Sequence, residues 1–570
     1  MVIKRVLWFS LLLTSACGRP RNDFAAFVED YFDAYYTARP SYGTAAGFHQ
    51  YDARLEDLSA KAVAARIGIL RAQLERVKLL SSAPLDAGAQ IDAAVIEGQI
   101  QAELLSLETL KTWRRNPMPY VGLPGEAIDG LMKRDFAPAA ERLKSMNARL
   151  KAIPAVLQAM RENVSNPPKE FTDLAIRMAG GSAGFFRDSV ATWARQAAGT
   201  DTALLAEFEA ANGAAIESVE AATVWLKSDL LPRSRGSYAI GAESFARLLL
   251  YEEMTDIPLD RLLAIGEANL DKDYNAFVET ARRIDPKRSP AQVMVSLSAE
   301  HPGADDLIPS AKRNLEAIRQ FLIDRKLVTV PSEARPIVTE TPPYARSGTF
   351  ASMDPPGAYE AKAAEAFYYV TPVEQEWDAK HKEEHLRLYN RPVMDMISIH
   401  EAYPGHFVQF LYVKQFPSKT RKLTFSSSNV EGWAHYSEQM MLEEGFGGAD
   451  PKARLAQLQE ALLRDCRYVA GIRLHTQGMT VEDAAKIFVE RGFQEPANAH
   501  EEARRGAYNP TYLYYTLGKL QIYRLREDYK KRRGASFNLK QFHDEFLRQG
   551  GIPIKLMRQA LLPEDTAPVL

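Results

Sequence analysis

The sequence has only two cysteines, Cys17 and Cys466, in 570 residues. If acylation takes Cys17, no intramolecular disulfide can form, and hydrophobic burial must stabilise the fold. Neither sign of charge is in excess, because 71 Lys and Arg side chains stand against 73 Asp and Glu side chains. Nucleic-acid-binding proteins normally concentrate a basic excess on one face or tail. The composition therefore argues against nucleic acid as a partner.

An apolar run long enough to span a bilayer, about 20 residues, is also missing, and the N-terminal apolar stretch covers only residues 6–13. Two basic residues precede this stretch and small residues lead up to Cys17, which is the pattern of an export signal with a lipoprotein processing site. We therefore predict a signal peptide over residues 1–16 and a lipidated tether over residues 17–23. An ordinary secretory signal or a cytosolic chain are the alternatives, because Thr14 stands where Leu is usual.

The residue after the predicted lipidated cysteine favours a location. Gly18, rather than Asp, follows Cys17, and by resemblance to lipoprotein sorting rules this indicates the periplasmic face of an outer membrane, with the cell surface as a second possibility. The lipid would be the only anchor, so we expect the rest of the chain to lie outside the bilayer.

Helical spacing of apolar residues and good helix formers dominate residues 24–326, which we predict to be a helical scaffold subdomain. The pattern changes between residues 327 and 373, where β-branched and aromatic residues stand between prolines and glycines. We predict short strands at 328–330, 336–341 and 366–371. Helices resume afterwards, so residues 327–570 are predicted to combine a small sheet with a helical metal-site subdomain.

The predicted class is mainly α, a large helical body with a cleft. The small β-sheet is expected beside the helix that carries the metal site. An edge strand of such a sheet could be joined by an extended peptide.

The segment His400-Glu-Ala-Tyr-Pro-Gly-His406 contains the residue types that zinc peptidases use. There, two histidines bind the metal and the glutamate beside the first activates a water molecule. The usual spacing of four puts both histidines on one helical face, whereas residues six apart point roughly 120° away from each other. Pro404 and Gly405 permit a local bulge that brings the histidines together, with Glu401 as general base. The competing interpretation is a buried, hydrogen-bonded histidine beside a surface glutamate.

A third ligand should come from another element and leave one position for water. The candidate is Glu431, although with Ser428 it could instead form a helix-capping box. His435 and Glu438 lie four and seven residues further on and share its helical face. We interpret His435 as a ligand, a partner of a ligand or a proton donor, and we rank Glu431 first as the ligand.

Residues 501–518 combine two arginines with four tyrosines. Tyrosine can stabilise an oxyanion and arginine can bind a substrate carboxylate, but aromatic packing and helical ion pairs explain the same residues. Arg504 and Arg505 could thus pair with neighbouring glutamates. The default role of His475 is a structural hydrogen bond.

Residues 180–184 fit the G-x-S-x-G pattern of serine hydrolases, with Ser182 as nucleophile. That pattern requires a strand before it and a helix after it. A helical segment precedes it here, so we interpret the glycines as a connection between helices.

Several segments together carry a resemblance to a known family. They are His400–Gln409 and residues 40–52, 231–236, 341–346, 430–438 and 510–518. With them the chain resembles the bacterial "domain of unknown function 885" family, a largely helical group related to zinc peptidases, over nearly the whole mature chain.

The resemblance implies a fold similar to helical metallocarboxypeptidases and neurolysin-like peptidases. It implies zinc bound by His400, His406 and Glu431, with Glu401 as general base and Tyr515 stabilising the oxyanion. The family often has a second histidine where this chain has Phe407, and residues 471–473 also depart from the usual acidic pattern.

We therefore expect a zinc (Zn2+) peptidase that hydrolyses short peptides, with Glu401 as general base and with His435 and Tyr515 in supporting roles. The alternatives are a lipoprotein that binds peptides or ligands without catalysis and, less favoured, a serine hydrolase that uses Ser182. The sequence predicts neither the position of the cleaved bond nor the oligomeric state.

Overall fold

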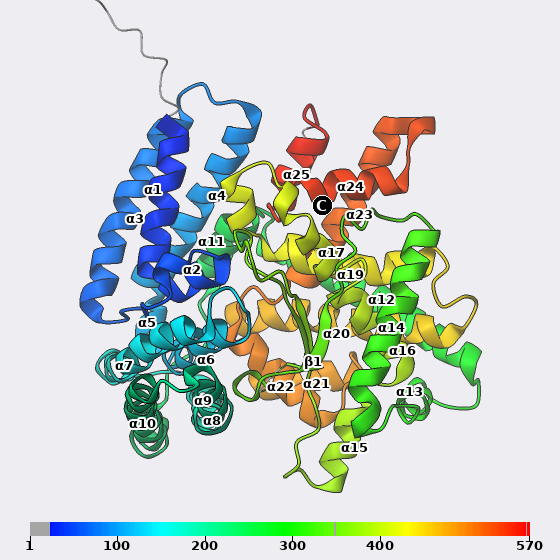
Figure 1. The fold of residues 1–570 in the computed structure, drawn as a ribbon. Helices are drawn as coiled ribbons and strands as arrows, with labels where there is room; N and C mark the ends of the chain where they lie inside the picture. The colour runs from blue at the N-terminus through cyan, green and yellow to red at the C-terminus, as the bar shows by residue number, and fades with distance from the viewer. Residues whose placement is uncertain (1–22, 347–348, 566) are drawn as a thin grey trace, which may run out of the picture.

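The computed structural model describes residues 23–346, 349–565 and 567–570, and helices make up most of it (Figure 1). The predicted mainly α class with one small sheet is confirmed. The predicted signal peptide and Cys17 lie outside the described residues. Among the helices of the described ranges, none is long and apolar enough to cross a membrane.

Helices from the first hundred residues form a bundle on one side of the molecule (Figure 1). Its core is rich in aromatic side chains, including Phe27, Tyr31 and Phe32. Side chains of Ser59 and Asp86 accept backbone N–H groups and thereby fix where the third and fourth helices begin. The helices are α1 Asp23–Ala38, α2 Pro40–Ala46, α3 Ala60–Ser81 and α4 Ala87–Leu104.

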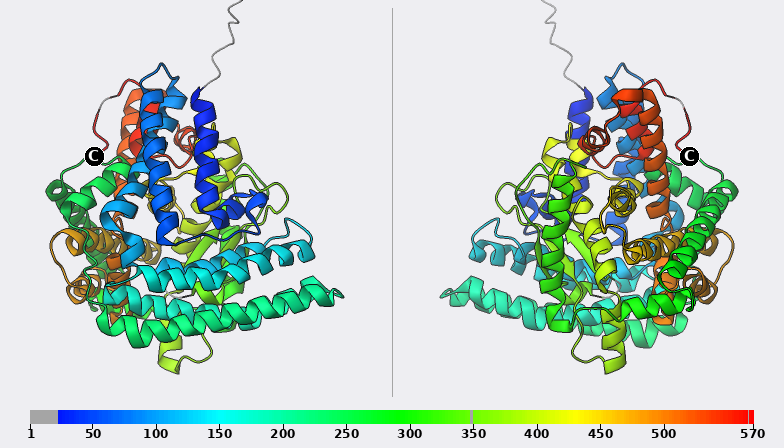
Figure 2. Two further views of the ribbon diagram at one scale, coloured as in Figure 1. Left: turned by 90° about the vertical axis from the view of Figure 1, so that its left-hand side faces the viewer. Right: turned by 90° about the vertical axis from the view of Figure 1, so that its right-hand side faces the viewer.

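A second bundle with its own hydrophobic core follows. Two connections in this bundle, at residues 116–117 and 164–168, contain prolines, which lack the backbone N–H that a continuing helix would use. Figure 2 shows α7 and α10 running side by side across one end of the molecule. The helices are α5 Thr112–Arg115, α6 Met118–Met132, α7 Ala139–Asn163, α8 Lys169–Phe185, α9 Ala191–Ala198 and α10 Thr202–Trp225.

The remaining helices, apart from α15 and α18, contribute to the largest hydrophobic core. This core contains Phe245 and Ile318 from before residue 327 together with Trp433 and Leu517 from after it, so the predicted boundary at 326/327 does not separate two cores. The helices are α11 Ala242–Glu253, α12 Leu259–Ile284, α13 Pro290–Ser298, α14 Leu307–Asp324, α15 Ala379–Arg387, α16 Arg391–Glu401, α17 His406–Leu411, α18 Lys419–Leu423, α19 Ser427–Glu443, α20 Pro451–Thr476, α21 Val481–Glu490, α22 Pro496–Tyr508, α23 Tyr514–Arg533, α24 Leu539–Arg548 and α25 Ile554–Leu561.

Three short strands form the sheet in the order β1-β3-β2. Strand β1 (Ile337–Glu340) is parallel to β3 (Phe367–Val370), and β2 (Ala351–Asp354) is antiparallel to β3. The Tyr368 hydroxyl lies 3.3 Å from the Ser398 hydroxyl of α16, so the sheet lies beside the helix that ends at the predicted metal site. The strands at 336–341 and 366–371 were predicted, whereas β2 was not.

The predicted strand at residues 328–330 is wrong. The Thr329 backbone N–H donates to the Asp544 carboxylate at 2.8 Å, and its carbonyl accepts the Tyr412 hydroxyl at 3.0 Å. Side chains therefore take the hydrogen bonds that a neighbouring strand would have taken.

Helices α19 and α23 touch through their backbones. A Cβ added to Gly432 would lie 2.5 Å from the Gly518 Cα, and a Cβ added to Gly518 would lie 1.8 Å from the Ser428 carbonyl oxygen. Only glycine therefore permits this approach at both positions.

We expect Gly518→Ala to lower the free energy of unfolding by about 1–3 kcal/mol, as overpacking in a core does. Gly213→Ala is the matched control, because Gly213 lies inside α10 with open space around a Cβ, and alanine there should stabilise by about 0.5–1 kcal/mol. Thermal and urea unfolding would measure both. Equal stability of Gly518→Ala and the parent protein would contradict the close backbone contact.

Candidate metal centre

The turn between α16 and α17 brings His400 and His406 together although they are six residues apart in the sequence. At the start of helix α16 the Asn390 side chain accepts the Val393 N–H at 3.3 Å, and the helix ends at Glu401. The Tyr403–Pro404 peptide bond is cis. The Gly405 N–H then donates to the Ile399 carbonyl at 3.0 Å, so the chain folds back onto the last turn of α16.

Glycine is required at position 405 because the backbone lies so close to the helix. A Cβ there would lie 1.8 Å from the His400 carbonyl oxygen and 2.5 Å from the Ile399 oxygen. The indole N–H of Trp433 donates to the Pro404 carbonyl at 2.9 Å. This bond ties the turn to α19, the helix that carries Glu431.

His400, His406 and Glu431 converge on one point. The two imidazole centroids are 4.9 Å apart with nearly perpendicular planes. One oxygen of Glu431 lies 3.3 Å from Nε2 of His400 and 3.4 Å from Nε2 of His406. One ligand atom of each residue lies within 4.8 Å of the others. Two imidazoles and one carboxylate are a donor set that suits a catalytic zinc ion and leaves a position for water.

Glu431 is available for this cluster because another residue caps its helix. Glu253, at the end of α11, accepts the backbone N–H groups of Ser427 and Ser428, each at 3.0 Å, and also binds the Ser428 hydroxyl. The capping box considered for Ser428 and Glu431 is therefore not formed. Glu253 is far away in the sequence, so the pattern around residue 431 could not reveal it.

Glu438 holds the first histidine in place from behind. One of its oxygens lies 2.7 Å from Nδ1 of His400, and the other lies 3.1 Å from Nδ1 of His435. Arg464 lies 3.4 Å away and compensates the buried charge. A carboxylate that accepts the second imidazole N–H of a ligand fixes the ring and its tautomer. The spacing of seven residues from Glu431 is the sequence signal for this role.

His435 lies away from the cavity. It is fully buried and is not one of the three converging residues. Its ring forms a hydrogen bond with the Glu438 oxygen that does not contact His400. Burial, with the positive charge of Lys519, lowers the pKa of His435 to about 3. The ring is therefore neutral, and its place is that of a partner of Glu438 rather than a group in contact with substrate.

The metal-free cluster is itself an ion pair. Burial lowers the pKa of His400, but hydrogen bonds to Glu431 and Glu438 outweigh it and raise this pKa to about 9. Burial raises the pKa of Glu431, but the charge of His406 and the hydrogen bonds from both histidines hold it well below its usual range. A proton on His400 therefore balances the carboxylate when no metal is bound.

A cavity of about 550 Å³ opens onto the cluster, and Glu401 and Tyr515 line it with the three converging residues. The Tyr515 ring stacks 6.2 Å from the His400 ring. Burial and the nearby Glu431 charge raise the pKa of Tyr515, so its phenol stays protonated and can donate a hydrogen bond. Residues of β2 line the same cavity.

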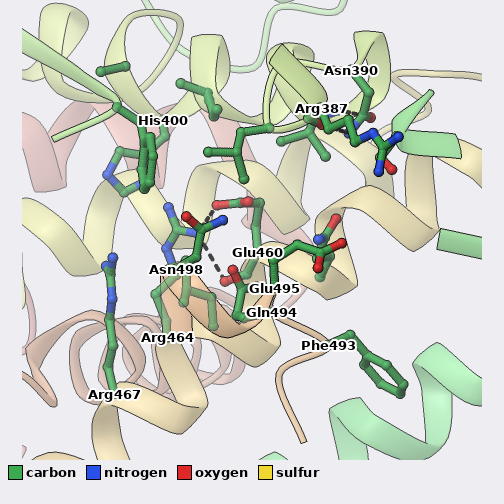
Figure 3. A pocket seen from close by; sticks show the side chains of 18 of the residues that line it. Arg387, Asn390, His400, Glu460, Arg464, Arg467, Phe493, Gln494, Glu495 and Asn498 are labelled. Atoms are coloured by element: carbon green, nitrogen blue, oxygen red, sulfur yellow. Dashed lines mark hydrogen bonds and ion pairs between the residues drawn. The ribbon is translucent and has the colours of Figure 1, made fainter. Parts of the chain in front are cut away.

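Figure 3 shows His400 with the side chains of Arg464 and Arg467 along one side of this pocket and Phe493 at another. Sequence reasoning gave no role to Arg464 or Arg467, because nothing near them in the sequence indicates that α20 borders the site. Of the two arginines considered from sequence, Arg505 lines the cavity, whereas Arg504 pairs with Glu501.

Two further residues considered from sequence lie in structural roles. His475 donates from Nε2 to the Gly506 carbonyl at 2.8 Å. Ser182 is buried inside α8, where its hydroxyl donates to the Met178 carbonyl at 3.2 Å. The interpretation of residues 180–184 as a connection between helices is wrong, because α8 continues through them to Phe185. This helix offers no strand-to-helix turn for a nucleophile.

The sequence matches one family model over residues 40–561, that of "Bacterial protein of unknown function (DUF885)". No curated protein matches the sequence. Two solved structures are similar along nearly their full lengths. One, described as "a putative lipoprotein of unknown function from Shewanella oneidensis", has 28% identity and a TM-score of 0.77, covering 95% of this chain and 99% of that one. The other, "the putative lipoprotein from Colwellia psychrerythraea", has 19% identity and a TM-score of 0.79, covering 95% and 98%.

We expect Glu438→Gln to weaken zinc binding about 10- to 100-fold, because a ligand histidine loses its charged partner. Competition with a chromophoric chelator would measure the dissociation constant. Glu443→Gln is the control, since Glu443 lies exposed on the same helix. Unchanged affinity of a folded Glu438→Gln protein would contradict the positioning role.

Zinc binding should also release about one proton, because His400 is protonated at pH 7 in the metal-free protein and must lose that proton to become a ligand. Affinity should therefore rise about tenfold per pH unit between pH 6 and 9 and level off above the pKa of His400. Calorimetry in two buffers with different ionisation enthalpies would count the proton. Affinity that does not change over this range would contradict the protonated cluster.

Proposed function

The chain belongs to the bacterial protein family of unknown function DUF885, and from this premise we propose that it is a zinc-dependent peptidase that hydrolyses short peptides. One observation carries the proposal. Two imidazoles and a carboxylate converge within 4.8 Å, and they border the same cavity as a further carboxylate, Glu401. This is the residue set that a hydrolytic zinc site requires.

His400, His406 and Glu431 would hold the metal. When bound, zinc polarises a carbonyl group and lowers the pKa of a water molecule. Glu438 keeps Nδ1 of His400 as a hydrogen-bond donor, so that Nε2, which faces Glu431, would lose its proton and offer its lone pair to the metal.

Glu401 follows His400 directly and closes the last turn of α16, and it is buried at the cavity wall. In the proposed reaction its carboxylate takes a proton from the water that adds to the peptide carbonyl. It then gives that proton to the leaving nitrogen as the carbon–nitrogen bond breaks. The products are an amine and a carboxylic acid, which releases its proton to solvent, and Glu401 returns to its starting state.

Tyr515 is the proposed donor to the developing oxyanion. Its ring lies beside His400, and its protonated phenol is available at neutral pH. A donor placed where negative charge develops stabilises the transition state more than the ground state.

The cavity suits a short, extended peptide. Its volume of about 550 Å³ is within the range of small-molecule sites rather than of protein-binding surfaces. Strand β2 pairs with β3 on one side only, and residues 351–353 line the cavity. A peptide backbone could therefore pair with the free edge of β2.

An exported, lipid-anchored protein at the periplasmic face of an outer membrane is the proposed setting. Two similar structures are described as putative lipoproteins, and the residues leading up to Cys17 have the lipoprotein pattern. A peptidase in this place would act on peptides in the periplasm.

The decisive variant is Glu401→Gln. It should keep zinc, since Glu401 is not among the three ligands, and should lose about 10²- to 10⁴-fold in the rate of hydrolysis, as expected when a general base is removed. Zinc content by elemental analysis and digestion of a defined peptide mixture by mass spectrometry would measure both quantities. His406→Ala should lose zinc and activity together.

Two controls separate the alternatives. Ser182→Ala should keep full activity, and its loss together with resistance to chelators would instead indicate serine chemistry. A zinc-loaded parent protein that leaves every peptide intact would refute the peptidase proposal. It would favour a lipoprotein that binds peptides without cleaving them.

A further inference from the structure

Three arginines border the cavity near Tyr515, and two of them are neutralised by glutamates. Arg467 binds both oxygens of Glu502, at 2.7 and 2.9 Å. Arg464 binds Glu460 and lies 3.4 Å from Glu438. These two guanidinium groups therefore have their charges balanced within the protein.

The third arginine, Arg505 on α22, is different. Across the described parts of the chain, no carboxylate lies within ion-pair distance of its guanidinium group. Its hydrogen bond goes to the Tyr515 hydroxyl at 3.5 Å, and its Cζ lies 5.3 Å from the Tyr512 ring. Glu502 is three residues away, but its oxygens are taken by Arg467 and the Tyr512 hydroxyl. Arg505 thus brings an unbalanced positive charge to the cavity wall.

A positive charge that is partly buried and has no counter-ion destabilises the folded protein unless an anion binds beside it. The planar guanidinium fork fits a carboxylate with two parallel hydrogen bonds. The position is also informative, because the Tyr515 hydroxyl that contacts Arg505 belongs to the ring that stacks on His400. The anion site and the three converging residues are therefore separated by a single tyrosine.

We propose that Arg505 binds the C-terminal carboxylate of the substrate, which makes the enzyme a peptidase that cleaves next to the free C-terminus. This inference rests on the proposed function, and it specifies the substrates as peptides with a free C-terminal carboxylate. Because an extended chain advances about 3.3–3.6 Å per residue, a carboxylate held one tyrosine away from the metal ligands fits release of a single amino acid or a dipeptide. The residues released would lie on the Tyr515 side, and the rest of the peptide would extend toward β2.

The test compares three peptides of one sequence: the free acid, the C-terminal amide, and an amide with aspartate as its last residue. The parent enzyme should cleave the free acid with a kcat/KM roughly 10- to 100-fold above either amide, as a charge-assisted pair supplies. The aspartyl amide separates a terminal carboxylate from a side-chain carboxylate. Arg505→Met should remove the preference, because kcat/KM for the free acid falls to that of the amides, mainly through a higher KM for the acid.

Arg504→Met is the matched control, because Arg504 is the adjacent residue on the same helix and pairs with Glu501 instead. It should keep the preference for the free acid. Cleavage of the acid and the plain amide at equal rates, cleavage of the aspartyl amide as fast as the acid, or products from internal bonds would each overturn the inference while leaving peptidase activity in place.

Binding gives a readout that does not need hydrolysis. In the Glu401→Gln background the free-acid peptide should bind roughly 10- to 100-fold more tightly than its amide by calorimetry, and adding Arg505→Met should abolish the difference. If the parent protein cleaves nothing, the proposed function fails, whereas this measurement still decides for or against the carboxylate site. Equal binding of acid and amide would refute it.

Discussion

The candidate site depends on the contact between the backbones of α19 and α23. At Gly432 and Gly518 no side chain separates the two helices. A Cβ at either position would clash with main-chain atoms, which cannot move away as a flexible side chain could. Glu431 is next to the first glycine and Tyr515 is one turn before the second. The distance between the proposed ligand Glu431 and the proposed oxyanion donor Tyr515 therefore depends on packed backbones more than on side-chain rotamers, which gives a site the precision that catalysis would need.

The same region buries many charges, and opposite charges offset their desolvation. An isolated buried ion costs several kcal/mol, yet Glu438 has Arg464 and Glu502 has Arg467 within reach. The proposed ligands follow the same rule, since His400 and Glu431 form an ion pair. The cluster can thus assemble without a metal, which distinguishes the proposed zinc site from a structural zinc site, where folding and metal binding are one event.

Local patterns in the sequence predicted the parts of the structure that local forces determine. The helix break between Glu401 and His406 and the strands at 337–340 and 367–370 each follow from a few neighbouring residues. Other parts of the structure depend on contacts between residues that are distant in the sequence. The Thr329 N–H donates to Asp544 and its carbonyl accepts from Tyr412, and strand propensity does not predict these two partners.

The site shows the same division between local and distant signals. The convergence of three residues could be anticipated from the broken helix and the polar stripe on α19. In contrast, the cap by Glu253 and the pairing that leaves Arg505 without a carboxylate depend on contacts between remote helices. Such contacts follow from tertiary packing and leave no local pattern in the sequence.

Three glutamates near the proposed metal site differ in their surroundings and therefore in the roles open to them. Glu438 is fully buried and held by Arg464 and two histidines, so it can only orient His400. The Glu431 side chain is 25% exposed and faces both imidazoles, and Glu401 borders the cavity from the end of α16. The wider histidine spacing makes this separation possible. Because the helix stops at Glu401 and the bond from Trp433 holds the following turn against α19, the second histidine returns to the ligand side while the glutamate between them stays on the cavity side.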